Sequence, residues 1–438
     1  MTKTTFYQGL KQIGGTFVTV ETECAICMFD FGFAISDRAD DRIKKRMESY
    51  TEDYVRLGIL PKVDGIYEKE VSDRLNVLPY GETKKECFVL ISHMHIDHMG
   101  GLGMLHKDVP VYMSDESERL YQRLAINNEV EYRKHENCTG VLFGEEITIL
   151  DITVKVLPID HDVIGASGFL ITTPDGTICY TGDYRFHGFH KEYTEAFAQS
   201  AKGADLLITE GVTVSFQDID MISLEEPEEE ATEETLQKEL SECSGAEKGL
   251  IVINPYNRNV ERIHRLIHTL KKAGRVLVLD AVQADYVKEF YPEDPISVYR
   301  ETRCGKLVPE TWLEVTRMDL LKSPEQFVLQ LDYKDMHELL DIARVVTLYI
   351  QMDGVPLGEY DPSFQKMMAL LENLGIPCER KSLGGHARPY DLRHMIDMIE
   401  PSVLVPLHSF RPEQVMSEKV KKRILPETED FITLPLDC

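Results

Sequence analysis

A chain of 438 residues, 43% of them hydrophobic, can bury two or three cores, so we expect more than one domain. Its formal net charge of -27 argues against a broad electrostatic grip on nucleic acid, although a locally basic cleft stays possible. No uncharged apolar run approaches the roughly 20 residues that span a bilayer, and no signal-peptide-like segment opens the sequence, which excludes a membrane partner. Nine cysteines without a regular framework fit free thiols, so we expect a soluble cytoplasmic protein.

The first two hundred residues alternate short β-rich runs with turns and helical stretches. These runs read TFVTVET, CAICMFDFG, KKECFVLISH, DVPVYMS, EITILDITVKVLPI, SGFLITTPDGTICYTGD and ADLLITEG. Runs of Val, Ile, Thr, Tyr and Phe bounded by Gly, Asp and Pro are typical of strands in a sheet that packs against helices. Cys24 and Cys27 stand in one such run, where residues three apart point to opposite faces, so we expect no redox or zinc role for the pair.

From about Gly211 the character of the chain changes. Eight glutamates between positions 225 and 239 accompany one lysine, and Leu224, Leu236 and Leu240 have helical spacing, which predicts a solvated surface helix. The segment GLIVINPYNRNVERIHRLIHTLKKAGRVLVLDA then alternates strand, helix and strand, as in a βαβ unit of a parallel sheet. The same alternation continues in ARVVTLYIQMD, DPSFQKMMALLENLG and IPCERKSLGGH, and DLRHMIDMIEPSVLVPLHSF adds a helix and a strand.

Four candidate metal ligands crowd into six residues directly after the strand-like run CFVLIS. They are His93, His95, Asp97 and His98, and Gly100 and Gly101 follow them. Sites form where buried strands end, and the two glycines give the backbone room to approach metal ions. Imidazoles and carboxylates suit Zn²⁺, at about 2.0 to 2.2 Å, and also suit Mn²⁺ or Fe.

Three further candidate ligands stand at the ends of other apolar runs. His161 ends TVKVLPIDH, Asp183 ends TICYTGD and His408 ends SVLVPLH. A single histidine of this kind is more often structural. Together with the H-x-H-x-D-H cluster, however, these residues predict strands that converge on one cleft with seven metal ligands.

These motifs resemble those of the metallo-β-lactamase superfamily, whose fold is an αββα sandwich. The resemblance implies two metal ions, one held by His93, His95 and His161, the other by Asp97, His98 and His408, with Asp183 between them. Asp30, which ends the run CAICMFD, matches the first motif of the family. It would contact the metal-binding loop from behind and orient it.

A narrower resemblance, to the β-CASP branch of RNA and DNA nucleases that includes RNase J, rests on Glu210 in LLITEG, His386 in LGGHARP and His408 in VPLH. This branch inserts an α/β domain into the sandwich. The analogy therefore predicts a metallo-β-lactamase core in 1–210 and 377–438 and an inserted β-CASP domain in 211–376. It also implies that Glu210 orients His386, which would contact the scissile phosphate or protonate the leaving oxygen.

The chain departs from the β-CASP pattern at three places. Gly384 stands where the family commonly has serine, Ser409 where it has glycine, and Gly211 where a serine or threonine is expected. No segment matches the phosphate-gripping loops of RNase J. These departures bear on the substrate and leave the metal ligands untouched.

The leading hypothesis is a dinuclear-metal phosphodiesterase that cleaves RNA, or less readily DNA. Two divalent ions, with zinc expected and Mn²⁺ or Fe as alternatives, about 3.5 to 4 Å apart would generate a hydroxide at neutral pH. Asp97 and Asp183 would be the catalytic carboxylates. Arg388, Asn257 and Arg258 are the candidate phosphate contacts.

Two other hypotheses stay open. The same metal ions in a closed pocket would suit a hydrolase for a small ester, thioester, lactone or nucleotide, which the acidic charge favours. A noncatalytic scaffold subunit is the third hypothesis, although every ligand position is filled. A homodimer is compatible with the sequence, which does not determine metal identity, endonuclease or exonuclease action, or the natural substrate.

Overall fold

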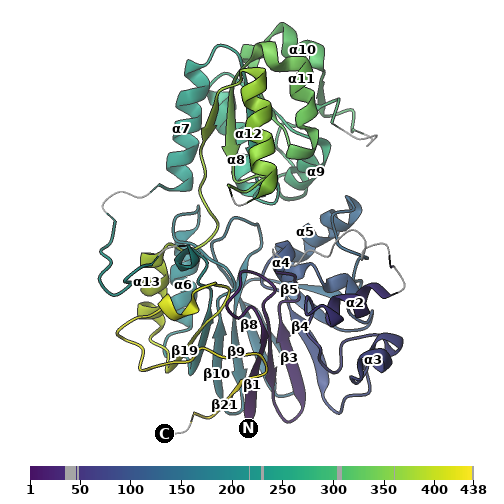
Figure 1. The fold of residues 1–438 in the computed structure, drawn as a ribbon, viewed down its shortest axis with the longest axis vertical. Helices are drawn as coiled ribbons and strands as arrows, with labels where there is room; N and C mark the ends of the chain where they lie inside the picture. Colours follow the sequence, from purple (N-terminus) through teal and green to yellow (C-terminus); the bar gives the residue numbers. More distant parts are fainter. Residues whose placement is uncertain are drawn as a thin grey trace. The chain divides into compact units, whose positions relative to one another are not determined.

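The computed structural model describes residues 1–34, 46, 49–216, 218–227, 231–302, 308–359 and 361–436. These residues form two compact units, described separately below (Figure 1). The first comprises Met1–Phe186, His190–Glu228 and Gly385–Cys438, and the second comprises His187–Phe189 and Glu229–Gly384. The domain limits predicted at 210/211 and 376/377 stay a prediction, because the compactness of a unit does not show where an insertion begins.

The first unit contains two seven-stranded sheets. In one sheet the order is β21 (Phe431–Leu434), β1 (Thr2–Gln8), β2 (Phe17–Glu21), β3 (Ala25–Phe29), β4 (Glu86–Leu90), β5 (Val111–Ser114) and β6 (Cys138–Val141). In the other it is β20 (Lys422–Arg423), β19 (Val403–Pro406), β11 (Leu206–Thr209), β10 (Gly176–Tyr180), β9 (Ser167–Thr173), β8 (Ile152–Pro158) and β7 (Glu146–Ile149).

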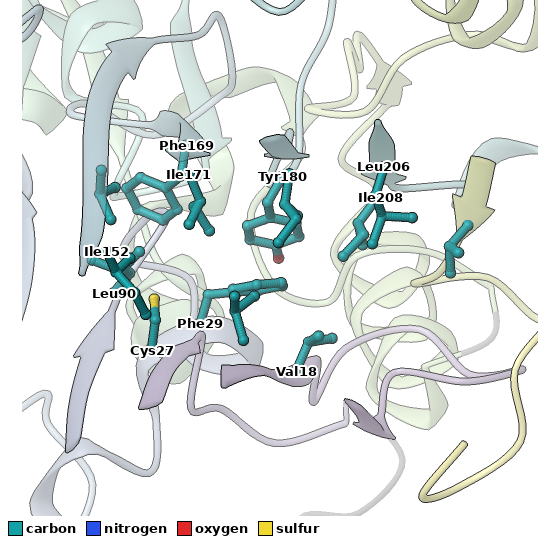
Figure 2. Close-up of a cluster of buried hydrophobic side chains, with 14 of the residues drawn as sticks. Val18, Cys27, Phe29, Leu90, Ile152, Phe169, Ile171, Tyr180, Leu206 and Ile208 are labelled. Atoms are coloured by element: carbon teal, nitrogen blue, oxygen red, sulfur yellow. The ribbon is translucent and has the colours of Figure 1, made fainter. Parts of the chain in front are cut away.

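Apolar side chains from both sheets meet in one core (Figure 2). Phe29 of β3 stacks on Tyr180 of β10 with ring centroids 4.4 Å apart. Along β8, Ile152 and Val154 are buried while Thr153 between them is partly exposed, as the period of two in a strand requires. One face of each sheet therefore belongs to this core.

Helices cover the outer faces of the two sheets (Figure 1). Those of the first unit are α2 (Tyr50–Arg56), α3 (Lys69–Leu75), α4 (Ile96–Met99), α5 (Asp115–Ile126), α6 (Lys191–Ser200) and α13 (Pro389–Ile399). Helix α5 packs on β5 and β6, whereas α6 packs on β8 and on α13. This is the αββα sandwich expected from the sequence, and the predicted fold class is confirmed.

Strand direction brings several carboxyl ends to one edge of the second sheet. Strands β10, β11 and β19 are parallel to one another. Strand β8 runs in the same direction, because both the β8/β9 and the β9/β10 pairs are antiparallel. Residues that follow these four strands can therefore lie close together, as His161 and His408 can although they are 247 positions apart in the chain.

The second unit contains a five-stranded parallel sheet, as the βαβ pattern predicted. Its order is β13 (Val276–Val278), β16 (Phe327–Gln330), β12 (Leu250–Pro255), β17 (Val346–Met352) and β18 (Cys378–Arg380), beside a small parallel pair of β14 (Ser297–Tyr299) and β15 (Leu313–Val315). Its helices are α7 (Glu233–Ala246), α8 (Val260–Lys272), α9 (Ala281–Phe290), α10 (Arg317–Lys322), α11 (Leu339–Ile342) and α12 (Pro362–Leu374). Within the described ranges, every helix is too short or too polar to cross a membrane.

The acidic segment differs from its prediction. Helix α7 begins only at Glu233, where Thr232 and Thr235 form a reciprocal capping box, and it buries Leu236 and Leu240. Leu224 lies outside the helix, and positions 228–230 lie outside the described residues. The predicted surface helix is thus present from Glu233 onward, with Leu236 and Leu240 on its buried face, but it is shorter than predicted and does not include Leu224.

Candidate metal centre

The seven predicted ligands come from four strand ends in the first unit. The motif after β4 supplies four of them, and α4 carries Asp97 and His98 on its single turn. His161 follows β8, Asp183 follows β10 and His408 follows β19. His408 has a φ of 52°, a left-handed conformation that a residue other than glycine rarely adopts and that is often found at functional sites.

The structure brings all seven side chains together in two neighbouring groups. Ligand atoms of His93, His95, His161 and Asp183 lie within 4.8 Å of one another, as do those of Asp97, His98 and His408. The Oδ2 atom of Asp183 lies between the groups, 3.8 Å from His93 Nε2, 3.1 Å from His98 Nε2 and 3.6 Å from His408 Nε2. This is the placement that a carboxylate shared by two cations requires.

Several of these atoms are buried without a hydrogen-bond partner of good geometry among the described residues. They are the Nε2 atoms of His93, His98 and His408 and Oδ2 of Asp183. An unsatisfied buried polar atom costs about 1 to 3 kcal/mol, so four at one point indicate a missing binding partner. Nitrogen and oxygen donors pointing at one another fit divalent metal ions, which would satisfy all four.

The pKa values suit this chemistry. Burial lowers the pKa of His161 to about 3 and also lowers that of His93, so both imidazoles are neutral, the form that binds a metal ion. Burial would raise the pKa of Asp183, but His408, His98 and His386 hold it well below its usual range. Burial likewise lowers the pKa of His98, but the carboxylates of Asp183, Asp30 and Asp97 outweigh it and raise that pKa. The three carboxylates thus attract a positive charge to this point.

Asp30 lies behind the cluster and is fully buried, with a left-handed φ of 58°. Its carboxylate accepts hydrogen bonds from His98 Nδ1 at 2.8 Å, from the Ser92 backbone N–H at 2.8 Å and from the Tyr180 hydroxyl. Because Nδ1 of His98 donates to Asp30, its Nε2 is the ring nitrogen left to face Asp183, and it becomes free to bind a cation when its proton leaves. The contact predicted for Asp30 is present, and its effect on metal binding stays a prediction.

Other contacts hold the remaining imidazoles. Nδ1 of His161 donates to the Gly385 carbonyl at 2.6 Å. A Cβ at Gly385 would lie 2.5 Å from the Asp162 carboxyl group and 2.7 Å from His161 Cε1, so only glycine fits there. Nδ1 of His408 accepts from the Gly14 N–H at 3.3 Å and lies 3.3 Å from Thr16 Oγ1, contacts that hold the ring with Nε2 toward Asp183.

Glu210 and His386 form a pair beside the cluster. Oε2 of Glu210 lies 3.1 Å from His386 Nδ1, and Oε1 accepts from the backbone N–H groups of Tyr184 and Ala387 at 3.1 and 3.3 Å. Nδ1 of His386 is also 3.7 Å from Asp183 Oδ2. Burial lowers the pKa of His386, but Glu210 and Asp183 outweigh it and raise that pKa to about 10. The buried carboxylate therefore holds a protonated, 26% exposed imidazole at the rim of the cluster.

Asp162 belongs to this site although the sequence did not single it out. Its Oδ1 atom lies 3.3 Å from His95 Nε2 and 3.4 Å from His161 Nε2. Burial would raise the pKa of Asp162, but His161 and His95 lower it well below its usual value. The acidic residue directly after His161 in the D-H-D triplet was the available signal, but the direction of its side chain depends on the fold.

The three candidate phosphate contacts lie in different units. Asn257 and Arg258 follow β12 in the second unit and are partly exposed, and the Asn257 carbonyl accepts from Gln283 Nε2 at 3.0 Å. Arg388 caps α13 in the first unit, where its backbone N–H donates to Asp391 at 3.4 Å. Their role in substrate binding stays a prediction.

The sandwich, with imidazoles and carboxylates gathered at the carboxyl ends of its strands, defines a metal-dependent hydrolase. A family profile of the beta-lactamase superfamily domain matches residues 74–237. Ribonuclease J from Pyrococcus abyssi is 23% identical over 431 residues, which cover 91% of this chain and 88% of that protein. Ribonuclease J from Mycoplasma genitalium is 19% identical, in an alignment that covers 93% of this chain and 68% of that protein.

A solved structure is similar over the whole chain. The crystal structure of a protein of unknown function from Enterococcus faecalis V583 matches with a TM-score of 0.83 and 31% identity, over 99% of this chain and 100% of that one. The chain belongs to the metallo-β-lactamase superfamily, in the β-CASP branch of RNase J-like proteins. The predicted family and the predicted hydrolase class are thereby confirmed.

Proposed function

We propose that this protein is a ribonuclease that hydrolyses phosphodiester bonds of RNA with two divalent metal ions. The observation that carries the proposal is the Glu210–His386 pair, whose imidazole lies 3.7 Å from the Asp183 carboxylate between the two ligand groups. Hydrolysis of a phosphodiester needs a proton for the departing oxygen, and an oriented imidazole can supply it. The likeness to RNase J proteins over 91 to 93% of the chain supports RNA as the substrate.

His93, His95 and His161 would hold one ion and Asp97, His98 and His408 the other, with Asp183 as a ligand of both. Zinc suits this donor set best, and Mn²⁺ or Fe would also fit. Bound ions would lower the pKa of water and neutralise charge on a phosphodiester.

The protein's own residues would do the rest. Glu210 accepts a hydrogen bond from His386 Nδ1. The other ring nitrogen, Nε2, therefore points away from Glu210 and would face a substrate oxygen. The second oxygen of Glu210 is held by two backbone N–H groups, so the carboxylate cannot turn away. His386 is therefore placed to hold a proton near the substrate, and Glu210 acts through it as a positioning residue.

Cleavage of a labelled single-stranded RNA by the protein loaded with Zn²⁺ or Mn²⁺ tests the proposal. Asp183→Ala should abolish cleavage, because the Asp183 carboxylate lies between the two ligand groups, 3.8 Å from His93 and 3.1 Å from His98. Asp108→Ala is the matched control. This carboxylate belongs to the same unit, is 62% exposed and lies beside His106, which is not a member of the cluster. Inertness of metal-loaded protein toward every RNA and DNA oligonucleotide tried would remove the proposal.

A second candidate is a hydrolase for a small ester, thioester, lactone or nucleotide. The net charge of -27 favours it, because a polyanionic substrate is repelled at long range. Parallel turnover measurements on a model phosphodiester, a lactone and a thioester separate the two candidates. A dominant carboxylic-ester activity would replace the ribonuclease.

A further inference from the structure

A second cluster of metal-binding side chains lies in the second unit, away in sequence from every residue of the candidate metal centre. His264 and His268 stand on α8, and Asp294 follows α9. Nδ1 of His264 is 2.7 Å from Asp294 Oδ2, and Nε2 of His268 is 2.8 Å from Asp294 Oδ1. One donor atom from each of the three lies within 4.8 Å of the others.

The cluster is held in place before any ion binds. The two histidines are four positions apart on one helix, so their side chains lie on the same face, one turn apart. The His264 ring stacks on Tyr291 with ring centroids 3.7 Å apart and planes 8° apart. Lys288 Nζ donates to the carbonyls of Pro292 and Asp294, which closes the turn that carries the carboxylate. Binding of an ion would therefore cost little side-chain entropy, because the ligand side chains are already ordered.

The side chains of Asp294, His264 and His268 differ in how far they are exposed to solvent. Asp294 is 5% exposed, whereas His264 is 26% and His268 is 46% exposed. A carboxylate that is nearly buried carries a negative charge with little help from water, and the two imidazoles are its polar neighbours here. Since the His268 side reaches solvent, an ion has a path to the carboxylate, and water can complete its coordination.

The present distances are those of hydrogen bonds, and a small movement converts them to metal spacing. Bonds of about 2.0 to 2.1 Å around a tetrahedral ion place neighbouring ligand atoms about 3.3 to 3.4 Å apart. The two contacts would thus open by about 0.6 Å, which rotation of an exposed histidine can provide. Each neutral ring gives up its N–H toward Asp294 by moving that proton to its other nitrogen, so the proton count is unchanged.

We propose that His264, His268 and Asp294 bind a divalent transition-metal ion, with zinc as the reference ion, that fastens α8 to the turn after α9. Two imidazoles and one carboxylate prefer Zn²⁺, Cu²⁺, Ni²⁺ or Co²⁺ over Mg²⁺ and Mn²⁺. The ion would stabilise the second unit, because the three ligands come together only in the folded chain. The site is independent of the proposed ribonuclease activity.

Metal content of the full chain tests the inference. Protein stripped with a chelator, reloaded with zinc sulfate and passed through a desalting column is analysed for zinc as wild type, His268→Ala and His337→Ala. His337 is the matched control, because it is a 66% exposed histidine of the same unit and its Nε2 atom lies 3.8 Å from Glu338 Oε1. We expect one zinc ion fewer per chain in His268→Ala and an unchanged content in His337→Ala.

Two further measurements keep the result interpretable. In a cobalt(II) titration followed by absorption, the apparent affinity of this site for cobalt should be at least tenfold lower in His268→Ala than in the wild type. In a thermal melt, zinc should raise the Tm of the wild type more than that of this variant. The same difference of one zinc ion should persist on an Asp183→Asn background, so failure of the catalytic centre and failure of this site are distinguishable. Equal zinc content in wild type, His268→Ala and His264→Gln would show a hydrogen-bonded triad only and overturn the proposal.

Discussion

Replacing Asp162 by Asn tests whether this carboxylate controls metal binding. The substitution keeps the shape of the side chain and removes the charge that lies 3.3 Å from His95 Nε2 and 3.4 Å from His161 Nε2. His95 Nδ1 lies 3.3 Å from His161 Nε2, the spacing expected for two ligands of one ion, which leaves His95 Nε2 to face Asp162. A carboxylate in this position fixes the ring and raises the basicity of the ligand.

Loss of such a partner typically weakens metal binding by about 10- to 100-fold, or about 1.4 to 2.7 kcal/mol. We expect the upper half of this range, because Asp162 faces two imidazoles and is only 13% exposed, so that water screens it little. The assay is competition with a chelator of known zinc affinity, followed by elemental analysis at each chelator concentration. The chelator concentration at the midpoint should fall by about 30- to 100-fold in Asp162→Asn.

Asp205→Asn is the control for a merely structural effect. Asp205 is a partly buried carboxylate of the same unit that accepts from the Thr177 N–H at 2.8 Å, so its replacement should lower Tm without changing the zinc midpoint. If Asp162→Asn loses thermal stability but keeps zinc within twofold of the wild type, the reasoning about Asp162 is refuted.

Two other predictions concern catalysis and pH. Glu210→Gln should keep its metal content and KM but lower kcat by about 10²- to 10⁴-fold, because His386 loses the carboxylate that orients it; an unchanged kcat with an altered KM would contradict this role. Burial, with the neighbouring Asp280, raises the pKa of Asp332 in the folded second unit to about 7. Because the folded pKa is the higher one, the folded state binds the extra proton, so stability falls as pH rises from about 4 to 7. Asp332→Asn should therefore stabilise the protein at pH 8, by no more than about 4 kcal/mol, and leave it unchanged at pH 4; urea unfolding at both pH values measures this, and an equal effect at both would show that proton linkage is not the cause.

Much of the candidate metal centre could be predicted from the sequence, because several of its residues are near neighbours in the chain. His93, His95, Asp97 and His98 are near neighbours in the chain, and any path after β4 leaves them close together. His161, Asp183 and His408 could be added because each follows an apolar strand, and parallel strands present their carboxyl ends at one edge. The sandwich itself followed from the same strand pattern and from the family motifs.

Other features depended on how distant segments pack. The sequence shows His264 and His268 one helical turn apart, but only the fold of the second unit brings Asp294 to them from beyond α9. The D-H-D triplet shows that Asp162 is next to a ligand, but only the tertiary structure turns its carboxylate toward His95, 67 positions earlier. Spacing along a helix or strand is set by local geometry and can be read from the chain, whereas the direction of a side chain toward a distant partner is set by packing.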